Sequence, residues 1–209
     1  RIGSTGTNVG GIVGNCSSAT VTDCINIGIV ECKQVHGSLI GNVSNAAATI
    51  SNLYYLEGTC AEGIGSVKNA ETQTATAKTA EELKTMITAG DHPYKAQMLA
   101  DLAVIAQEIA DKAAAKAVDD LIDAIGEVTL GDECKKIDAA RKAYDELTDV
   151  QKELVNNLET LTAAEAAYEA LVNQAAAKAV DDLIDAIGDV TLTDDCKAKI
   201  DAARKAYDE

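Results

Sequence analysis

The spacing of apolar residues changes along the chain, and the change predicts two kinds of structure. Over residues 1–68, β-branched residues and glycines alternate with Asn, Ser and Thr, and the helical period is absent. Such a pattern predicts short strands joined by sharp turns. After residue 79, apolar residues recur every three or four positions, which places them on one face of a helix. The predicted fold class is therefore α+β, with strands first and helices after them.

The strand-rich segment contains an internal repeat. Residues 10–15 (GGIVGN) match residues 37–42 (GSLIGN) at an offset of 27, and residues 20–24 match residues 49–53 at an offset of 29. Units of this length, built from short strands and turns, are typical of β-solenoid coils. We therefore expect this segment to be a short β-solenoid piece. Two coils are too few for a stable solenoid, which favours a larger parent protein.

The helical segment is a tandem duplication. Residues 113–134 recur almost unchanged as residues 175–196, and KIDAARKAYDE follows both copies. The apolar stripes of one copy predict a three-helix bundle, with one helix ending at Gly126, one beginning near Asp132 and one beginning at Thr148. The expected buried stripes are Ala117, Val118, Leu121, Ile122, Ile125, Ile137, Ala140, Tyr144, Leu147, Val150, Leu154, Val155 and Leu158.

Capping boxes predict three helix starts, since a Thr followed three residues later by Glu or Gln satisfies free backbone donors at a helix N-terminus. They lie at residues 79–82, 148–151 and 162–165. The last opens an apolar stripe that reaches Ile187 without Gly or Pro, so one long helix is expected to end the first bundle and start the second. Another long helix is expected to start at residues 91–93. Bundles that share long helices predict an elongated rod.

These boundaries predict four segments. The strand-rich piece covers residues 1–68, a connector with a short helix covers 69–92, the first three-helix repeat covers 93–174, and a second, truncated repeat covers 175–209. The chain starts without Met and stops within a repeat, so both ends are expected to lie inside a longer protein.

Composition and charge narrow the range of functions. The chain has no Phe or Trp, and a core of small side chains favours slender repeats over a deep catalytic pocket. The net charge is −16, and most acidic residues follow residue 79. Such a surface repels phosphate backbones and anionic lipid, so nucleic acid and membrane surfaces are poor partners. No apolar run is long enough to span a bilayer, so no membrane insertion is expected.

Two parts of the chain resemble known families. Residues 9–15 (VGGIVGN), and again residues 37–42 with ATISNLYY after them, resemble the GLUG motif of bacterial surface proteins, although His36 and Ser38 stand where the motif has glycine. Residues 147–171 (LTDVQKELVNNLETLTAAEAAYEAL) resemble helical repeats of Gram-positive cell-wall and surface proteins. The first resemblance implies a secreted, adhesin-like protein without catalytic residues in this region. The second implies a spacer or binding stalk.

The six cysteines leave three interpretations open. No CxxC is present, and the gaps among the first three differ from compact zinc-ligand spacings. Free buried thiols are favoured, one disulfide among the first four is the alternative, and a metal site is least favoured. Cys134 and Cys196 occupy equivalent positions one repeat apart, so they are expected to face the core without pairing. The first four are Cys16, Cys24, Cys32 and Cys60.

The remaining polar candidates give no sign of catalysis. The two histidines, His36 and His92, are not marked as partners of a Ser or Cys nucleophile. The duplicated carboxylates are expected to form a solvated helix face; a calcium site is the weaker alternative, because straight helices lack the loop carbonyls that calcium prefers. We expect no catalytic residue, cofactor or metal. The carboxylates are Asp119, Asp120, Asp123, Asp181, Asp182 and Asp185.

The pattern as a whole favours a structural role. We expect a non-enzymatic, monomeric spacer or stalk of an extracellular, cell-surface, adhesin-like protein, attached to the cell wall through regions outside this chain. Its partners would be other domains of the same protein. The alternative is a module that binds host glycan or protein on the solenoid face. The aromatic pair Tyr54 and Tyr55 would supply the contact. Neighbouring residues of a strand face opposite sides, so one of the two rings is expected to face outward, where it could stack on a sugar.

Overall fold

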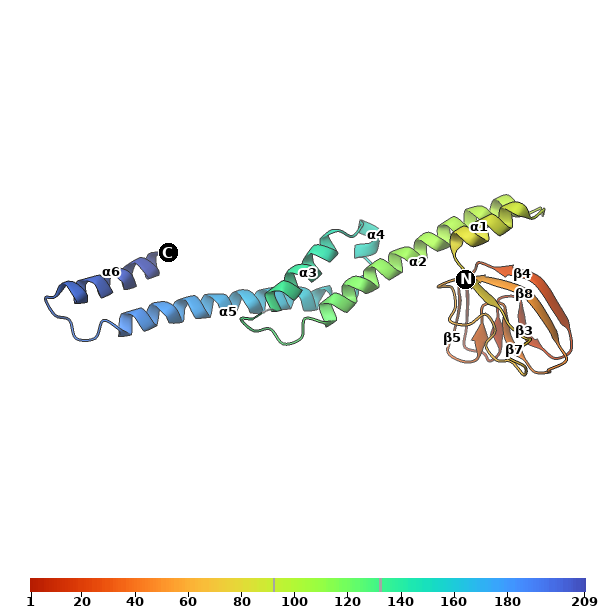
Figure 1. Ribbon diagram of the computed structural model, residues 1–209, viewed down its shortest axis with the longest axis horizontal. Coiled ribbons are helices and arrows are strands. Elements are labelled where there is room, and N and C mark those ends of the chain that lie inside the picture. The colour runs from red at the N-terminus through yellow and green to blue at the C-terminus, as the bar shows by residue number, and fades with distance from the viewer. Residues whose placement is uncertain (92, 132) are drawn as a thin grey trace. The chain divides into compact units, whose positions relative to one another are not determined.

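The computed structural model describes residues 1–91, 93–131 and 133–209. Among these residues the chain combines strands, all before residue 79, with six helices that follow them (Figure 1). The prediction of a chain with both strands and helices is therefore confirmed. The contacts divide the chain into two compact units, Arg1–Asp111 and Lys112–Glu209, each with its own core.

The strands of the first unit are short, and every neighbouring pair is parallel. Four consecutive strands pair one to one with the next four, and a ninth strand extends the last pair. In order, β1 (Ile2–Ser4) pairs with β5 (Val30–Cys32), β2 (Val9–Gly10) with β6 (His36–Gly37), β3 (Val13–Cys16) with β7 (Ile40–Val43), and β4 (Thr20–Asn26) with β8 (Thr49–Leu56), which also pairs with β9 (Thr76–Lys78).

The register of the strands equals the offsets of the sequence repeat. Val13 lies opposite Ile40, and Thr20 lies opposite Thr49. Asp23 and Asn52 also lie one repeat apart, both with a left-handed backbone (φ 57° and 53°) that Asp and Asn adopt more readily than most residues. The Asn52 amide donates to the Asp23 carboxylate at 2.8 Å. Similar hydrogen bonds join Asn42 to Asn15 and Asn45 to Ser18.

The first unit contains two apolar clusters. One lies among the strands and is centred on Leu39, Ile40 and Val43, which are fully buried. The other joins Leu56 of β8 to α1 (Ala80–Ala89) and to the first part of α2 (Lys95–Asp123). Because residues 95–109 of α2 belong to this second cluster, the first helical repeat starts later than the predicted residue 93.

The strand-rich region also extends beyond the predicted end at residue 68. β9 continues the β8 ladder, and the buried side chain of Gln73 ties the intervening loop to the strands. Its amide nitrogen donates to the carbonyl oxygens of Asn45 and Ala48, and its oxygen accepts from the backbone nitrogens of Lys68 and Asn69. Residues 69–78 are therefore tied to the strands through Gln73 and β9, although most of their side chains are exposed.

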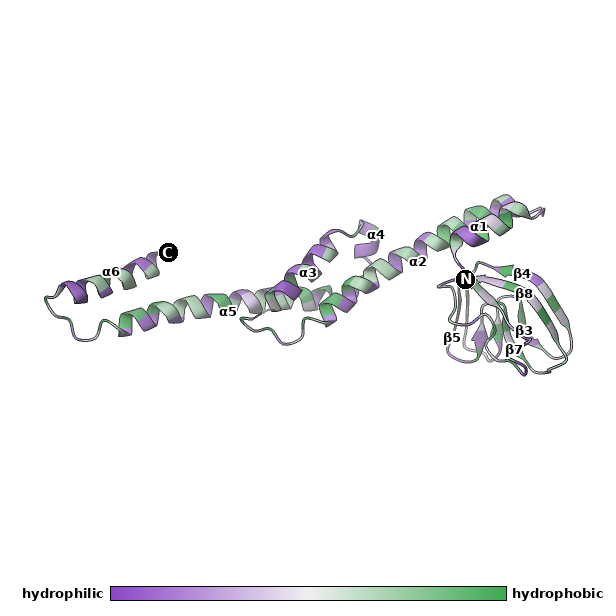
Figure 2. Cartoon of the chain, in the orientation of Figure 1, coloured by the Kyte–Doolittle hydropathy of each residue, from purple (hydrophilic) through white to green (hydrophobic). Residues whose placement is uncertain are grey.

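The helices of the second unit follow the duplication. Besides the end of α2, they are α3 (Glu133–Asp145), α4 (Asp149–Lys152), α5 (Leu158–Asp185) and α6 (Asp194–Asp208). α5 runs without interruption from the first copy of the repeat into the second, as predicted. Apolar and polar residues alternate around α2 and α5 (Figure 2). The predicted helix starts at His92 and Asp132 lie outside the described residues. No helix of the described residues is long and apolar enough to cross a membrane.

Two of the three predicted capping boxes are present. Thr79 caps α1 through Glu82, and Thr148 caps α4 through Gln151. The third is wrong, because α5 already begins at Leu158. Inside that helix the hydroxyl of Thr162 donates to the carbonyl oxygen of Leu158 at 3.2 Å, the usual bond of a threonine within a helix.

The first repeat, residues 112–174, has one apolar core. It joins the end of α2 to α3 and to the start of α5 through Ile122, Ile137 and Leu161. The buried members are Val118, Ile122, Ile125, Ile137, Ala140, Leu161 and Ala164. Three of the predicted core positions, Ala117, Leu121 and Val150, are instead exposed. Val150 lies in α4, a single turn that has no buried residue.

Candidate interaction surface

The predicted ligand contacts, Tyr54 and Tyr55, are both at least partly buried. Tyr55 is 7% exposed and belongs to the strand core, where burial, followed by the charge of Glu62, raises the pKa of its hydroxyl. Tyr54 faces the other way, as expected, but packs half-buried against the cluster that contains Leu56 and Leu83. Tyr55 is therefore closed to a ligand, whereas Tyr54 keeps part of its surface exposed, and contact of a glycan or protein with this pair stays a prediction.

All six cysteines are free thiols. Cys16 and Cys196 are buried, and the other four are partly buried. Along the strands, Cys16 lies opposite Val43 and Cys24 opposite Leu53, so these thiols stack on apolar residues of the next strand. They behave as small hydrophobic side chains in this core.

His36 and the remaining metal candidates do not form a reactive cluster. The His36 ring is half-buried, and its Nδ1 lies 2.6 Å from the Gln34 carbonyl oxygen. His92 lies outside the described residues. Within the described parts of the chain, no three His, Cys, Asp or Glu side chains lie close enough together to hold a metal ion.

The duplicated carboxylates have different roles in the two copies. In the first repeat, Asp119 accepts hydrogen bonds from the Asn156 backbone nitrogen at 2.9 Å and from its side-chain nitrogen at 2.8 Å. Asp123 accepts from the side chain of Asn157 at 2.7 Å. These bonds anchor the turn that precedes α5. Asp119 is therefore half-buried rather than fully solvated as predicted, whereas Asp123 is exposed and also hydrogen-bonded.

Hydrogen bonding changes the acidity of two carboxyl groups in the first repeat. Partial burial of Asp119 opposes the change, but the hydrogen bonds from Asn156 and Asn157 lower its pKa below the ordinary value. Glu165 forms a bidentate pair with Arg141, with nitrogen–oxygen distances of 2.6 and 2.7 Å. This hydrogen bonding lowers the pKa of Glu165 and raises that of Arg141.

The second repeat, residues 175–209, contains the same residues without the covering segment. Ile122 is 1% exposed, whereas its equivalent Ile184 is 48% exposed. Ile137 is 5% exposed, whereas its equivalent Ile200 is 39% exposed. The difference arises because residues 147–168 cover this face only in the first repeat, through Leu158, Leu161 and Ala164.

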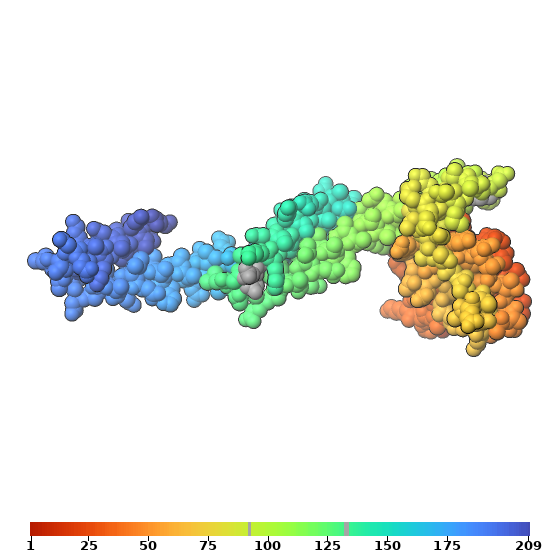
Figure 3. Space-filling view, viewed as in Figure 1, coloured from red at the N-terminus to blue at the C-terminus, as the bar shows by residue number. Residues whose placement is uncertain are grey.

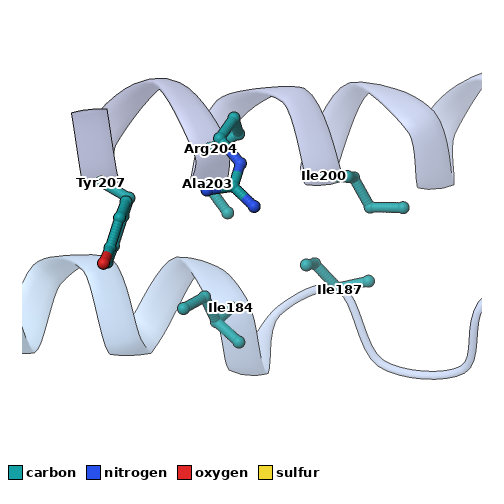
Figure 4. Close-up of a pocket in the computed structure, with 6 residues that line it drawn as sticks. All are labelled: Ile184, Ile187, Ile200, Ala203, Arg204 and Tyr207. Carbon is teal, nitrogen blue, oxygen red and sulfur yellow. The ribbon is translucent and has the colours of Figure 1, made fainter. Parts of the chain in front are cut away.

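The uncovered face forms a shallow apolar groove. α6 lies alongside the second half of α5 (Figure 3), and their facing side chains enclose about 380 Å³. Tyr207 stands at one end of the groove and is 69% exposed, and Arg204 lies beside Ala203 (Figure 4). The lining residues are Ile184, Ile187, Ile200, Ala203, Arg204 and Tyr207, and we call this surface the open face.

The open face could not be predicted from the sequence, because a stripe of apolar residues has the same pattern whether or not another helix covers it. The signal available in the sequence was the recurrence of Ile122, Ile137 and Ala140, which are covered in the first copy, as Ile184, Ile200 and Ala203 in the second.

Comparison with protein-family models, with curated proteins and with solved structures found no match to this chain.

Replacing Asp119 with asparagine is expected to lower the free energy of unfolding of the first repeat by about 1 kcal/mol at neutral pH, since it removes charge-assisted hydrogen bonds at a partly exposed site. The pKa of Asp119 is lower in the folded chain than in the unfolded one. The stability that the ionised Asp119 contributes is thus complete above its pKa in the unfolded chain, about 4. That stability is lost as the pH falls through its pKa in the folded chain.

Thermal unfolding followed by circular dichroism at pH 7 and at about pH 3 measures this effect. The matched control is Asp181→Asn, because no described residue donates a hydrogen bond to the carboxylate of Asp181. We expect the control to change stability by less than about 0.5 kcal/mol. Equal effects of the two substitutions, or an Asp119→Asn effect that persists at low pH, would contradict the assignment.

Proposed function

We propose that this chain is a non-enzymatic spacer, a stalk segment of a secreted bacterial cell-surface protein with an adhesin-like architecture. The observation that carries the proposal is α5, one uninterrupted 28-residue helix. Its first half supplies Leu161 and Ala164 to the core of the first repeat, and its second half supplies Ile184 to the open face of the second. A bend between the repeats would break helical backbone hydrogen bonds, whereas a loop would bend freely.

In this proposal the strand-rich half is a short β-solenoid and the helical half is a tandem array of three-helix bundles. Parallel pairing of strands 27 to 29 residues apart, together with the polar side-chain bonds at the same offsets, supports the solenoid. The single core shared by α2, α3 and α5 supports the bundle. Both architectures grow by adding units along one direction, which suits a spacer.

The proposed location and partners rest on resemblance. The GLUG-like residues 9–15 and 37–42 and the surface-protein-like residues 147–171 support a position on the outside of a Gram-positive cell. The wall anchor and the presented head would lie in other parts of the same protein. A monomer suits this role, because a spacer needs only its neighbours in the chain.

Small-angle X-ray scattering on the whole chain, with and without calcium, tests the proposal. We expect a maximum dimension well above that of a compact 209-residue globule, unchanged by calcium. A scattering profile that fits a compact globule would overturn the spacer proposal. A calcium-dependent change would instead favour a cation site at the duplicated carboxylates.

Replacing Ala176 with proline is expected to remove the stiffness of the junction between the repeats. Ala176 is an exposed residue inside α5, where proline deletes a backbone hydrogen bond and clashes with the preceding turn, at a cost of about 3 kcal/mol. In scattering, the distance distribution should broaden. Ala176→Gln is the matched control, because glutamine favours helix at the same exposed position. Identical profiles for the two variants would show that helix continuity contributes no stiffness.

A further inference from the structure

The two copies of the repeat present the same face in two states. In both, two antiparallel helical segments bring together a pair of isoleucines and an alanine: Ile122, Ile137 and Ala140 in the first copy, and Ile184, Ile200 and Ala203 in the second. In the first copy these side chains are almost fully buried, and in the second both isoleucines are exposed. The first copy therefore shows what kind of segment this face accepts.

The apolar part of that segment is the start of α5. Leu161 is fully buried and Ala164 is buried against the isoleucines, with Leu158 and Tyr168 packed around them. The spacing of these residues is three, three and four positions, which places all four on one helix face. A helix with this stripe fits the face through about three turns.

The polar part of the segment makes two kinds of contact at the rim. Glu165 pairs with Arg141, and Asn156 and Asn157 donate to Asp119 and Asp123. The three residues of the face that make these contacts recur in the second copy. Arg141 recurs as Arg204, and the two aspartates recur as Asp181 and Asp185.

These equivalents are not engaged in the same way. Arg204 forms an ion pair with Asp208 of its own helix at 4.0 Å and lies over the ring of Tyr207, and its side chain is 71% exposed. Among the described residues, no group donates a hydrogen bond to the carboxylates of Asp181 or Asp185. The second copy thus keeps the apolar and the polar residues that bind residues 147–168 in the first copy, and no described segment occupies them.

We propose that the open face is a docking site for a helical segment with the chemistry of residues 147–168. The segment carries an Asn-Asn pair, an apolar stripe at the positions of Leu158, Leu161 and Ala164, and a glutamate at the position of Glu165. On docking, that glutamate pairs with Arg204, the two asparagines donate to Asp181 and Asp185, and the stripe buries Ile184 and Ile200. The inference does not depend on the spacer role, since the face would accept the segment in any larger protein.

Charge and pattern favour this occupant over a second open face. Two open faces packed together would supply neither the glutamate that pairs with the arginine nor the asparagine donors that bind the carboxylates. A small apolar ligand would fill the groove but leave the carboxylates and the guanidinium unused. Only the helical segment matches both halves of the pattern.

The first experiment adds a synthetic peptide of residues 147–171 to the whole chain and measures binding by calorimetry and amide hydrogen exchange. We expect saturable binding, with slower exchange in residues 180–187 and 197–207 and no change in residues 118–125 and 137–144. Because an isolated helix of this length is marginally stable in water, a second protein carries the same residues in register directly after Glu209. In it, the same amides should be protected without added peptide.

A charge exchange supplies the matched control. Arg204→Glu should weaken peptide binding about tenfold or more, and a peptide with arginine in place of Glu165 should restore it. Arg204→Gln, which removes the charge without reversing it, should give an intermediate loss.

Three results of the binding experiments would overturn the proposal. They are failure of both the peptide and the appended segment to protect the open face, binding that is indifferent to Arg204→Glu, and protection confined to the first repeat. Self-association of the chain that buries Ile184 and Ile200 without peptide would also overturn it, by assigning the face to a second copy. Each of these outcomes is independent of the scattering test of the spacer role.

Discussion

Replacing Gly37 with alanine is expected to lower the free energy of unfolding of the first unit by about 3 kcal/mol, because the added methyl group would clash with backbone atoms of neighbouring segments. A Cβ at this position would lie 2.2 Å from the carbonyl oxygen of Ile40, 2.6 Å from the backbone nitrogen of Gly65 and 2.8 Å from the carbonyl oxygen of Gly63. All three are backbone atoms of paired segments. They cannot move aside unless hydrogen bonds between successive strands are lost.

Gly3→Ala is the control for this substitution. Gly3 also lies in a strand, β1, but a Cβ there would meet no atom within 4 Å. We expect a change of less than about 0.5 kcal/mol. Urea unfolding combined with amide exchange in β7 measures both variants. If Gly37→Ala were as stable as Gly3→Ala, the close stacking of the strands at Gly37 would be wrong.

The same crowding explains why the strand register equals the offsets of the sequence repeat. Gly10 faces the carbonyl oxygen of Val13 and the backbone nitrogen of Gly41, and Gly37 faces the corresponding atoms of Ile40 and Gly65. A residue without a side chain is needed each time the chain passes this point, so the glycine pattern repeats with the stacking. The offset between repeated glycines is therefore the offset between paired strands.

The end of the strand-rich region could not be predicted in this way. β9 has the sequence Thr-Ala-Lys, which carries neither the glycine pattern nor an apolar alternation. It belongs to the sheet because β8 offers it a free edge, and Gln73 holds the loop before it through four hydrogen bonds. The β8–β9 pairing and two of the Gln73 bonds join residues more than twenty positions apart, and the other Gln73 bonds lie within an irregular loop. The local pattern of apolar and polar residues predicts neither kind of contact.

The helical half shows the limit of local pattern more sharply. Thr162 and Glu165 match a capping box, yet they lie inside α5, and Glu165 pairs with Arg141 of α3 instead. The pattern of a capping box is short enough to occur within a helix, and only packing decides which role it takes. Likewise, ten consecutive residues, Ala-Val-Asp-Asp-Leu-Ile-Asp-Ala-Ile-Gly, occur in both copies. Their periodicity predicts which side chains share a face but not whether that face is covered.

Replacing Ile122 with alanine is therefore expected to have a far larger effect than the same substitution at Ile184. Ile122 is 1% exposed and lies among Val118, Ile137 and Leu161, so its truncation should cost about 3 kcal/mol in lost burial and a residual cavity. Ile184 is 48% exposed, and its truncation leaves no enclosed cavity. We expect that loss to be less than about 1 kcal/mol.

Urea unfolding followed by circular dichroism measures the two variants, and their identical local sequences make helix propensity cancel between them. A loss at Ile184 as large as that at Ile122 would mean that the second repeat is already covered in solution. The docking proposal adds a further expectation for the chain that carries residues 147–171 in register after Glu209. There, the segment should cover the open face, and the cost of Ile184→Ala should rise toward that of Ile122→Ala, because burial of the isoleucine depends on the covering helix rather than on the ten residues around it.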